Sequence, residues 1–230
     1  MQQTVYAIIM ILLTVGVFLV MRRLYIRFPF QLLLPMLTST VLIISILLLF
    51  HISYEDYMVG GEWINTFLGP AVVSLAYPLY KQRKVLVTYI FPILSGVFAG
   101  ICSAMVSGLL FAKVLGVDRS LILSLIPKSI TTPVAIQVSS VIGGVPSITV
   151  VFVMIAGFTG VILGPFIFKW TRIQSSLGRG IAFGSASHAI GTSKAFEYGE
   201  LTVSMSSVAM TLSAIFGSVI GPLFVWLFHI

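Results

Sequence analysis

The sequence contains little charge, few acidic residues and one cysteine. Only 8% of its 230 residues are charged, and six of them are Asp or Glu. Soluble globular domains carry about 25% charged residues, so this composition excludes an ordinary soluble protein. Cys102 has no partner for an internal disulfide and lies in an apolar run, so we expect a small buried side chain there.

The motifs of several enzyme classes are also missing. The chain has no HExxH, CxxC, GxSxG or Walker sequence, so zinc hydrolysis, thiol redox chemistry, serine hydrolysis and ATP coupling lack their groups. Ser187 stands directly before His188, but adjacent residues rarely reach attack geometry, and no acid is placed to orient the imidazole. No apolar run holds the carboxylate pair of a proton-coupled cation exchanger. The sequence therefore predicts no enzyme, no cofactor and no metal.

Long apolar runs make up most of the chain, which is 58% hydrophobic. A helix needs about 20 apolar residues to cross the hydrocarbon core of a bilayer. Six runs are predicted to cross: Thr4–Met21, Gln31–Phe50, Trp63–Tyr80, Val85–Ala112, 147–168 and Leu201–Phe228. The third is interrupted at Gly69-Pro70 and at Pro78, so an irregular crossing is expected there. The composition predicts an all-α polytopic membrane protein, with residues 1–230 forming one integral membrane domain and 1–112 its N-terminal helices.

Basic residues predict how the chain is oriented. Nine of the thirteen stand in three clusters: Arg22, Arg23 and Arg27; Lys81, Arg83 and Lys84; Lys169, Arg172 and Arg179. The positive-inside rule places such clusters in the cytoplasm, which puts the N-terminus outside. The acidic stretch His51–Glu62 is then expected to be an outer loop. Because orientation accounts for the net charge of +7, no nucleic-acid partner is predicted.

Two polar segments interrupt the C-terminal half. For the third basic cluster to be cytoplasmic, residues 120–145 must enter the membrane and return to the same side. Their middle, Pro127 to Pro133, contains two prolines, three hydroxyls and a lysine, as a hairpin tip in a membrane requires. A single broken crossing is the alternative. The same logic predicts a second re-entrant segment at 180–198.

A repeat relates these two halves. Gly160, Gly164 and Pro165 recur as Gly217, Gly221 and Pro222, and Ser147 recurs as Ser204, each displaced by 57 residues. Units 119–170 and 176–227, each a broken segment plus a crossing, are predicted to run in opposite directions. Inverted repeats with broken elements are typical of secondary transporters. The alternative is two unrelated helices that pack through GxxxG faces.

A second set of small residues lies in the fourth run. Gly96, Gly100, Ser103, Ser107 and Gly108 form a stripe, for which close helix packing is the first interpretation and a substrate path the alternative.

The chemistry of the two broken segments favours an anion. Lys128 and Lys194 flank them, His188 lies within one, and no acidic residue occurs between Arg119 and Phe196. A lysine in a membrane without an acidic neighbour is costly, so a bound anion is a natural partner. The alternatives are snorkelling of the lysines to the interface and a histidine bonded to a neighbouring helix. The predicted binding residues are Lys128, Ser129, Thr131, Thr132, Ser187, His188, Gly191, Thr192, Ser193 and Lys194.

The same stretches carry a resemblance to a known family. Leu125–Ile148, with its Pro-Lys-Ser-Ile-Thr-Thr-Pro run, and Gly184–Glu200, with Ser-His-Ala-Ile-Gly-Thr, resemble the CidB/LrgB family of bacterial membrane proteins. Leu68–Val73 is a weaker match. Lys194 stands where the family often has arginine, and Ser213 where it often has asparagine, which places in doubt any role of those side chains.

The resemblance implies two functions. Family members were described as holin-like or antiholin-like modulators of murein hydrolase activity, autolysis and programmed cell death, acting with a small CidA/LrgA-type membrane partner. Related proteins resemble carriers of monocarboxylates such as pyruvate, glycolate or glycerate. We expect a carrier of a small organic anion in a bacterial cytoplasmic membrane, with the holin-like role as the alternative. Small-residue stripes also suit a homodimer.

Overall fold

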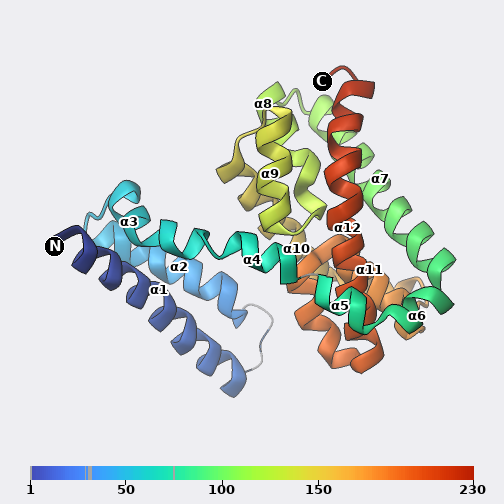
Figure 1. The fold of residues 1–230 in the computed structure, drawn as a ribbon, viewed down its shortest axis with the longest axis horizontal. Coiled ribbons are helices and arrows are strands. Elements are labelled where there is room, and N and C mark those ends of the chain that lie inside the picture. The colour runs from blue at the N-terminus through green and yellow to red at the C-terminus, as the bar shows by residue number, and fades with distance from the viewer. Residues whose placement is uncertain (1, 29, 31–32, 75) are drawn as a thin grey trace. The chain divides into compact units, whose positions relative to one another are not determined.

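The computed structural model describes residues 2–28, 30, 33–74 and 76–230, and its regular structure there is entirely helical. This confirms the predicted all-α membrane fold (Figure 1). The longer helices are α1 (Gln2–Arg27), α2 (Pro35–Leu49), α3 (Tyr54–Asn65), α7 (Ile90–Val114), α9 (Thr132–Ile142), α10 (Pro146–Trp170), α11 (Ser176–Ala195) and α12 (Glu200–Leu227). Shorter elements connect them: α4 (Leu68–Ser74), α5 (Ala76–Lys81), α6 (Arg83–Thr88), α8 (Arg119–Leu125) and the 3-10 turns η2 (Ile126–Ser129) and η3 (Phe196–Tyr198).

Four of the described helices are long and apolar enough to cross a membrane, namely α1 from Thr4 onward, α7, α10 and α12. Two predicted crossings, 147–168 and Leu201–Phe228, agree with α10 and α12 to within a few residues. The first predicted crossing is too short, because α1 continues to Arg27. For Gln31–Phe50, residues 31 and 32 lie outside the described part of the chain, and α2 covers 15 of the remaining residues.

The stretch 51–80 differs from its prediction. His51–Glu62, expected as a loop, is mostly helix α3. Ser53 begins this helix by accepting a hydrogen bond from Asp56 N at 3.1 Å, and two acidic side chains in the first turn complement the helix dipole. The predicted crossing Trp63–Tyr80 is a series of short helices, with Leu75 outside the described residues. Irregularity in this stretch was predicted correctly, because its glycine and prolines disfavour one continuous helix.

The predicted crossing Val85–Ala112 is two helices. The backbone at Tyr89 leaves the helical region, with φ of −115° and ψ of 29°, so α6 ends there and α7 begins at Ile90. Pro92 then falls in the first turn of α7, where its missing N–H breaks no helical bond.

Contacts divide the described chain into two compact units, Met1–Pro70 and Ala71–Ile230. In the first, Gly60 of α3 packs on α1, since a Cβ at Gly60 would lie 2.7 Å from Ala7 O. Thr14 Oγ1 and Tyr57 Oη lie 2.9 Å apart across the same helix pair. Helix α7, which belongs to the predicted N-terminal helices 1–112, packs on the C-terminal helices and so lies in the second unit.

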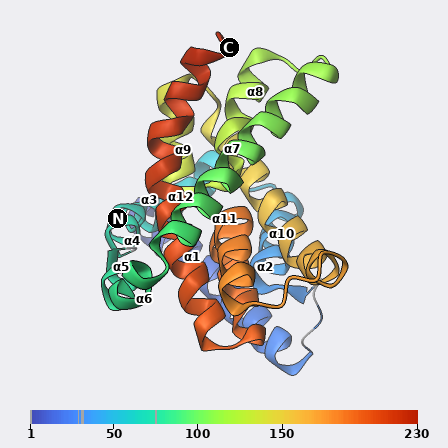
Figure 2. The same cartoon turned by 90° about the vertical axis from the view of Figure 1, so that its right-hand side faces the viewer.

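The second unit contains both predicted broken segments. Its core joins Ile93, Val97, Ile101 and Met105 of α7 to buried side chains of the C-terminal helices. Along α12, α9 lies beside one half and α11 beside the other (Figure 2). Helix α12 is therefore the support that both polar segments share.

Candidate functional site

Residues 119–145 form a hairpin. Helix α8 leads to the turn η2, and α9 then returns the chain to the level of α8. Val145 N donates to Ser124 Oγ at 2.8 Å, and a Cβ at Gly144 would lie 2.9 Å from Ser124 N. A single broken crossing, the alternative, would separate these residues by the length of the segment, so the structure supports the predicted hairpin.

Buried hydrogen bonds hold the base of this first hairpin to α10. Thr149 Oγ1 lies 2.7 Å from Ser139 Oγ and 3.0 Å from Ser124 O. The side chains of Ser124, Ser139 and Thr149 are fully buried. Buried polar groups are costly unless they are paired, so this cluster fixes both arms of the hairpin against α10.

Helix α11 is interrupted at His188 and forms the second hairpin. His188 has φ of 42° and ψ of −128°, in a region that side-chain-bearing residues rarely adopt. Beyond it the chain doubles back, so that Gly191 packs directly on the main chain of Phe183. At the base, the Arg179 guanidinium carbon lies 5.1 Å from the centre of the Tyr198 ring. The structure therefore also supports the predicted hairpin at 180–198.

Close packing holds this second hairpin to α12. A Cβ at Gly180 would lie 2.5 Å from Met205 Cβ, and one at Gly184 would collide with Ser206 O. Phe183 is packed between aromatic neighbours, with its ring centre 4.9 Å from that of Phe168. Only glycine allows the two backbones to approach this closely.

The tips of the two hairpins meet. His188 Nε2 lies 3.3 Å from Lys128 O, which joins the reversal of α11 to the turn η2. The Lys128 amine extends to α7 and donates to Ala104 O at 2.5 Å. Three separate elements thus converge on one lysine in the interior of the second unit.

Contacts around the tips are reciprocal between the two halves. A Cβ at Gly160 of α10 would collide with Ser187 of the second tip, and one at Gly217 of α12 would collide with Ile130 of the first. The displacement of 57 residues relates position 160 to 217 and position 130 to 187, so the two contacts correspond to each other. These glycines pack on hairpins, which disfavours the alternative of two helices joined through GxxxG faces. The common origin of the two units stays a prediction.

Most predicted binding residues lie at the tips. Ser129 and Thr131 are buried beside Lys128, and Thr132 begins α9. Around the second tip stand Ser187, His188, Gly191 and Thr192. Thr192 Oγ1 donates to His188 O at 3.0 Å and lies 2.9 Å from Ser206 Oγ. Ser187 Oγ and Ser213 Oγ are buried without a hydrogen-bond partner among the described residues.

Two predicted residues are not brought to the tips. Ser193 is exposed and donates to Ala189 O of its own helix at 3.1 Å. Lys194 forms an ion pair with Glu197 at 2.6 Å. The expectation that Lys194 lacks an acidic neighbour is therefore wrong, because Glu197 follows the acid-free stretch directly and is within reach at three residues' distance.

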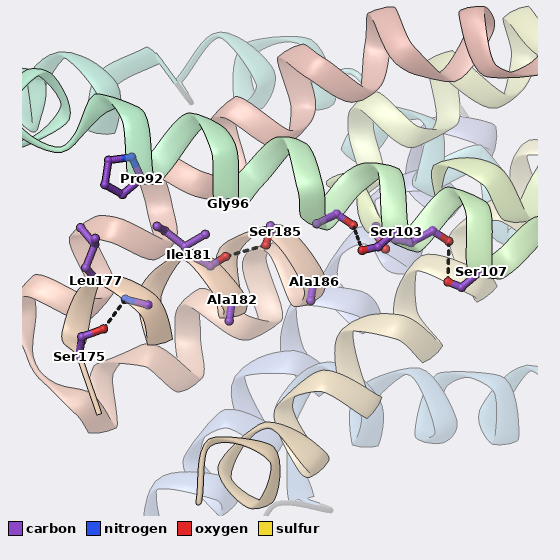
Figure 3. Close-up of a pocket in the computed structure, with 14 residues that line it drawn as sticks. Pro92, Gly96, Ser103, Ser107, Ser175, Leu177, Ile181, Ala182, Ser185 and Ala186 are labelled. Carbon is purple, nitrogen blue, oxygen red and sulfur yellow. Dashed lines mark hydrogen bonds between the residues drawn. The ribbon is translucent and has the colours of Figure 1, made fainter. Parts of the chain in front are cut away.

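Sequence reasoning missed the contribution of α7. A groove of about 730 Å³ runs between α7 and the first half of α11 (Figure 3). Ser103 and Ser107 of α7 line it, together with Ser129 of the first tip and Ser185 of α11. The small-residue stripe was the available signal. Its packing interpretation holds at Gly96, Gly100 and Gly108, which contact the hairpins, whereas its two serines face the groove.

The fold and the site define the class: an all-α, multi-pass membrane protein with two hairpins that meet inside its C-terminal unit. The family model of the LrgB-like family matches residues 14–227, so the chain belongs to that family. It is 66% identical to "Uncharacterized protein YxaC" of Bacillus subtilis over 230 residues, all of both chains. It is 40% identical to "Holin-like protein CidB" of Staphylococcus aureus over 229 residues, again all of both chains. No solved structure was found to match.

Proposed function

We propose that this protein is a secondary carrier of a small organic anion, a monocarboxylate such as pyruvate, glycolate or glycerate. The observation that carries the proposal is the meeting of the two hairpin tips at Lys128 O and His188 Nε2, 3.3 Å apart. Secondary carriers place substrate where broken elements from two repeats meet, near the middle of the bilayer. The proposed substrate then lies between the two hairpin tips.

Charge at the tips supports an anion as the substrate. Lys128 has no ion-pair partner among the described residues, and its amine donates to a carbonyl oxygen instead. Helix α9 begins four residues later, at Thr132, so the positive end of its dipole lies close to Lys128 in the chain. A carboxylate beside Lys128 would complement both.

The proposed site consists of the residues that the tips bring together, with the hydroxyls and main-chain N–H groups holding the carboxylate. These are Lys128, Ser129, Thr131, Thr132, Ser187, His188, Gly191 and Thr192. Ser193 and Lys194 are left out because their side chains are engaged elsewhere.

The proposed setting is the cytoplasmic membrane of a bacterium. The basic stretches at 22–27, 81–84 and 169–179 would face the cytoplasm by the positive-inside rule, and with 22–27 on that side at the end of the first crossing the N-terminus would be outside. This orientation also makes both hairpins enter from opposite faces, as an inverted repeat requires.

A holin-like membrane protein is the second candidate. The name of the staphylococcal relative, "Holin-like protein CidB", supports this role, and the comparisons favour it over the carrier. In this candidate an oligomer, acting with a small CidA/LrgA-type partner, forms or blocks a pore and thereby modulates murein hydrolase activity and autolysis.

Reconstitution into proteoliposomes separates the two candidates. The carrier predicts saturable uptake of labelled pyruvate or glycolate, inhibited by the unlabelled acid, with no release of a trapped neutral sugar. A pore predicts unsaturable uptake together with release of the sugar. Absence of flux above empty vesicles for both acids, with and without the partner protein, would remove the carrier proposal.

A further inference from the structure

The groove between α7 and α11 changes in character along its length. One end is lined by Pro92, eight residues after the basic stretch 81–84, and by Ser175, which lies within the basic stretch 169–179. The inner end is lined by hydroxyls, those of Ser103 and Ser107 on α7 and Ser129 at the tip of the first hairpin. The groove therefore leads from the basic end of the unit to the turn that carries Lys128.

The amine of Lys128 lies beside this inner end: Lys128 does not itself line the groove, but its amine contacts Ala104, which does. The amine donates to Ala104 O, which also accepts from Ser107 Oγ at 3.2 Å. Gly108 makes the approach possible, since a Cβ there would lie 2.8 Å from Lys128 Nζ. An ammonium group has three donors, and one carbonyl oxygen leaves donors for a further acceptor. No carboxylate of the described residues is paired with it.

We propose that a small carboxylate binds at the inner end of this groove, where Lys128 exchanges Ala104 O for the anion and the hydroxyls of Ser103, Ser107 and Ser129 donate to it. The inference rests on the proposed carrier function. It adds α7 to the two hairpin tips as a third element that lines the binding site. It also assigns an access route from the basic, cytoplasmic end of the unit.

The hydroxyls on α7 suit this role because they can reorient. Ser103 now donates to Gly100 O at 3.0 Å and Ser107 to Ala104 O, both within their own helix. These carbonyls keep their ordinary helical donors, so the hydroxyls can turn to an anion without leaving a buried group unpaired. Hydrogen bonds to a charged acceptor are the stronger ones, so the exchange favours the bound state.

Thiol accessibility provides the test. In a Cys102→Ala background, Ser107→Cys is exposed to a membrane-impermeant maleimide in inside-out membrane vesicles, with and without pyruvate or glycolate. Val106→Cys is the matched control, because it lies at the same depth of α7, is 38% exposed and does not line the groove. A thiol reacts as its thiolate, which forms in water and not in lipid.

The proposal expects rapid labelling of Ser107→Cys and little of Val106→Cys. It also expects one of the acids, at about ten times its half-protecting concentration, to slow labelling about tenfold, whereas choline has no effect. Absence of labelling, labelling from the outer side only, or labelling without protection by either acid overturns it. Saturable uptake without protection would remove the groove site and keep the carrier, whereas protection without uptake would keep the groove site and remove the carrier.

Discussion

The two hairpins have the same outline but are held in different ways. The first is fixed at its base by buried hydrogen bonds from Thr149 to Ser139 and Ser124. The second is fixed by contact, with Gly180 and Gly184 pressed against α12 and an aromatic cluster around Phe183. Two hairpins with the same backbone path are thus stabilised by different kinds of interaction.

This difference also separates the roles of the tips. The first tip supplies the lysine, Lys128, which lies in the regular 3-10 turn η2. The second supplies the strained residue, His188, whose conformation persists only because its surroundings determine it. The comparison leads us to expect that the second hairpin is more sensitive to added volume, and the first to lost hydrogen bonds.

The largest effect is expected from Gly184→Ala in the second hairpin. The new methyl group would collide with Ser206 O and lie 2.9 Å from Ala209 Cβ, where backbone atoms cannot give way. We expect a loss of about 3 kcal/mol or a failure to fold, measured by thermal unfolding in detergent. Gly16→Ala is the control, because no atom lies within 4 Å of a Cβ at Gly16. Equal melting temperatures for the two variants would contradict the expectation that the second hairpin is sensitive to added volume.

A smaller effect is expected from Thr149→Val at the base of the first hairpin. The change keeps the shape but removes the hydroxyl that bonds Ser139 and Ser124 O, so buried groups lose a partner and we expect about 1–3 kcal/mol of destabilisation. Thr192→Val, at a half-buried bond of the second hairpin, should cost about 1 kcal/mol. Denaturation in detergent compares them, and a greater loss for Thr192→Val would contradict the assignment.

The smallest effect is expected from Tyr198→Leu. Its ring centre lies 5.6 Å from that of Phe183, and an aromatic pair contributes about 0.5–1.5 kcal/mol beyond the area that it buries. The same unfolding assay applies, with Tyr54→Leu as the control because Tyr54 is 68% exposed. A cost above that of Thr149→Val would show that aromatic contacts, and not hydrogen bonds, dominate at the hairpin bases.

Much of the C-terminal unit follows from the sequence. Prolines and hydroxyls at 127–133, glycines at 184–191 and the spacing of the basic clusters predict two hairpins, because turn chemistry and charge placement are local properties. The position of the second reversal was not predicted, because His188 is neither glycine nor proline. Tertiary contacts from α10 and the first tip surround this residue instead.

Other features depend on information that local patterns do not contain. The helix α3 was missed because its three acidic residues, with no Lys or Arg among them, favoured an outer loop, whereas the cap at Ser53 indicates a helix. The groove beside Ser103 and Ser107 needs the placement of α7 against α11, which a stripe of small residues leaves open. The pairing of Lys194 with Glu197 depends on how the second hairpin ends.

Uptake of labelled pyruvate and glycolate by proteoliposomes, compared between Lys128→Gln and Lys194→Gln, tests the central claim most directly. The account predicts that Lys128→Gln lowers saturable uptake by about 10- to 100-fold, because one hydrogen bond to a charged group contributes about 1.5–3 kcal/mol. Lys194→Gln, which loses an ion pair to the half-exposed Glu197, should stay within about twofold of the unchanged protein. Equal losses in the two variants, or an unsaturable flux that neither variant alters, would contradict it.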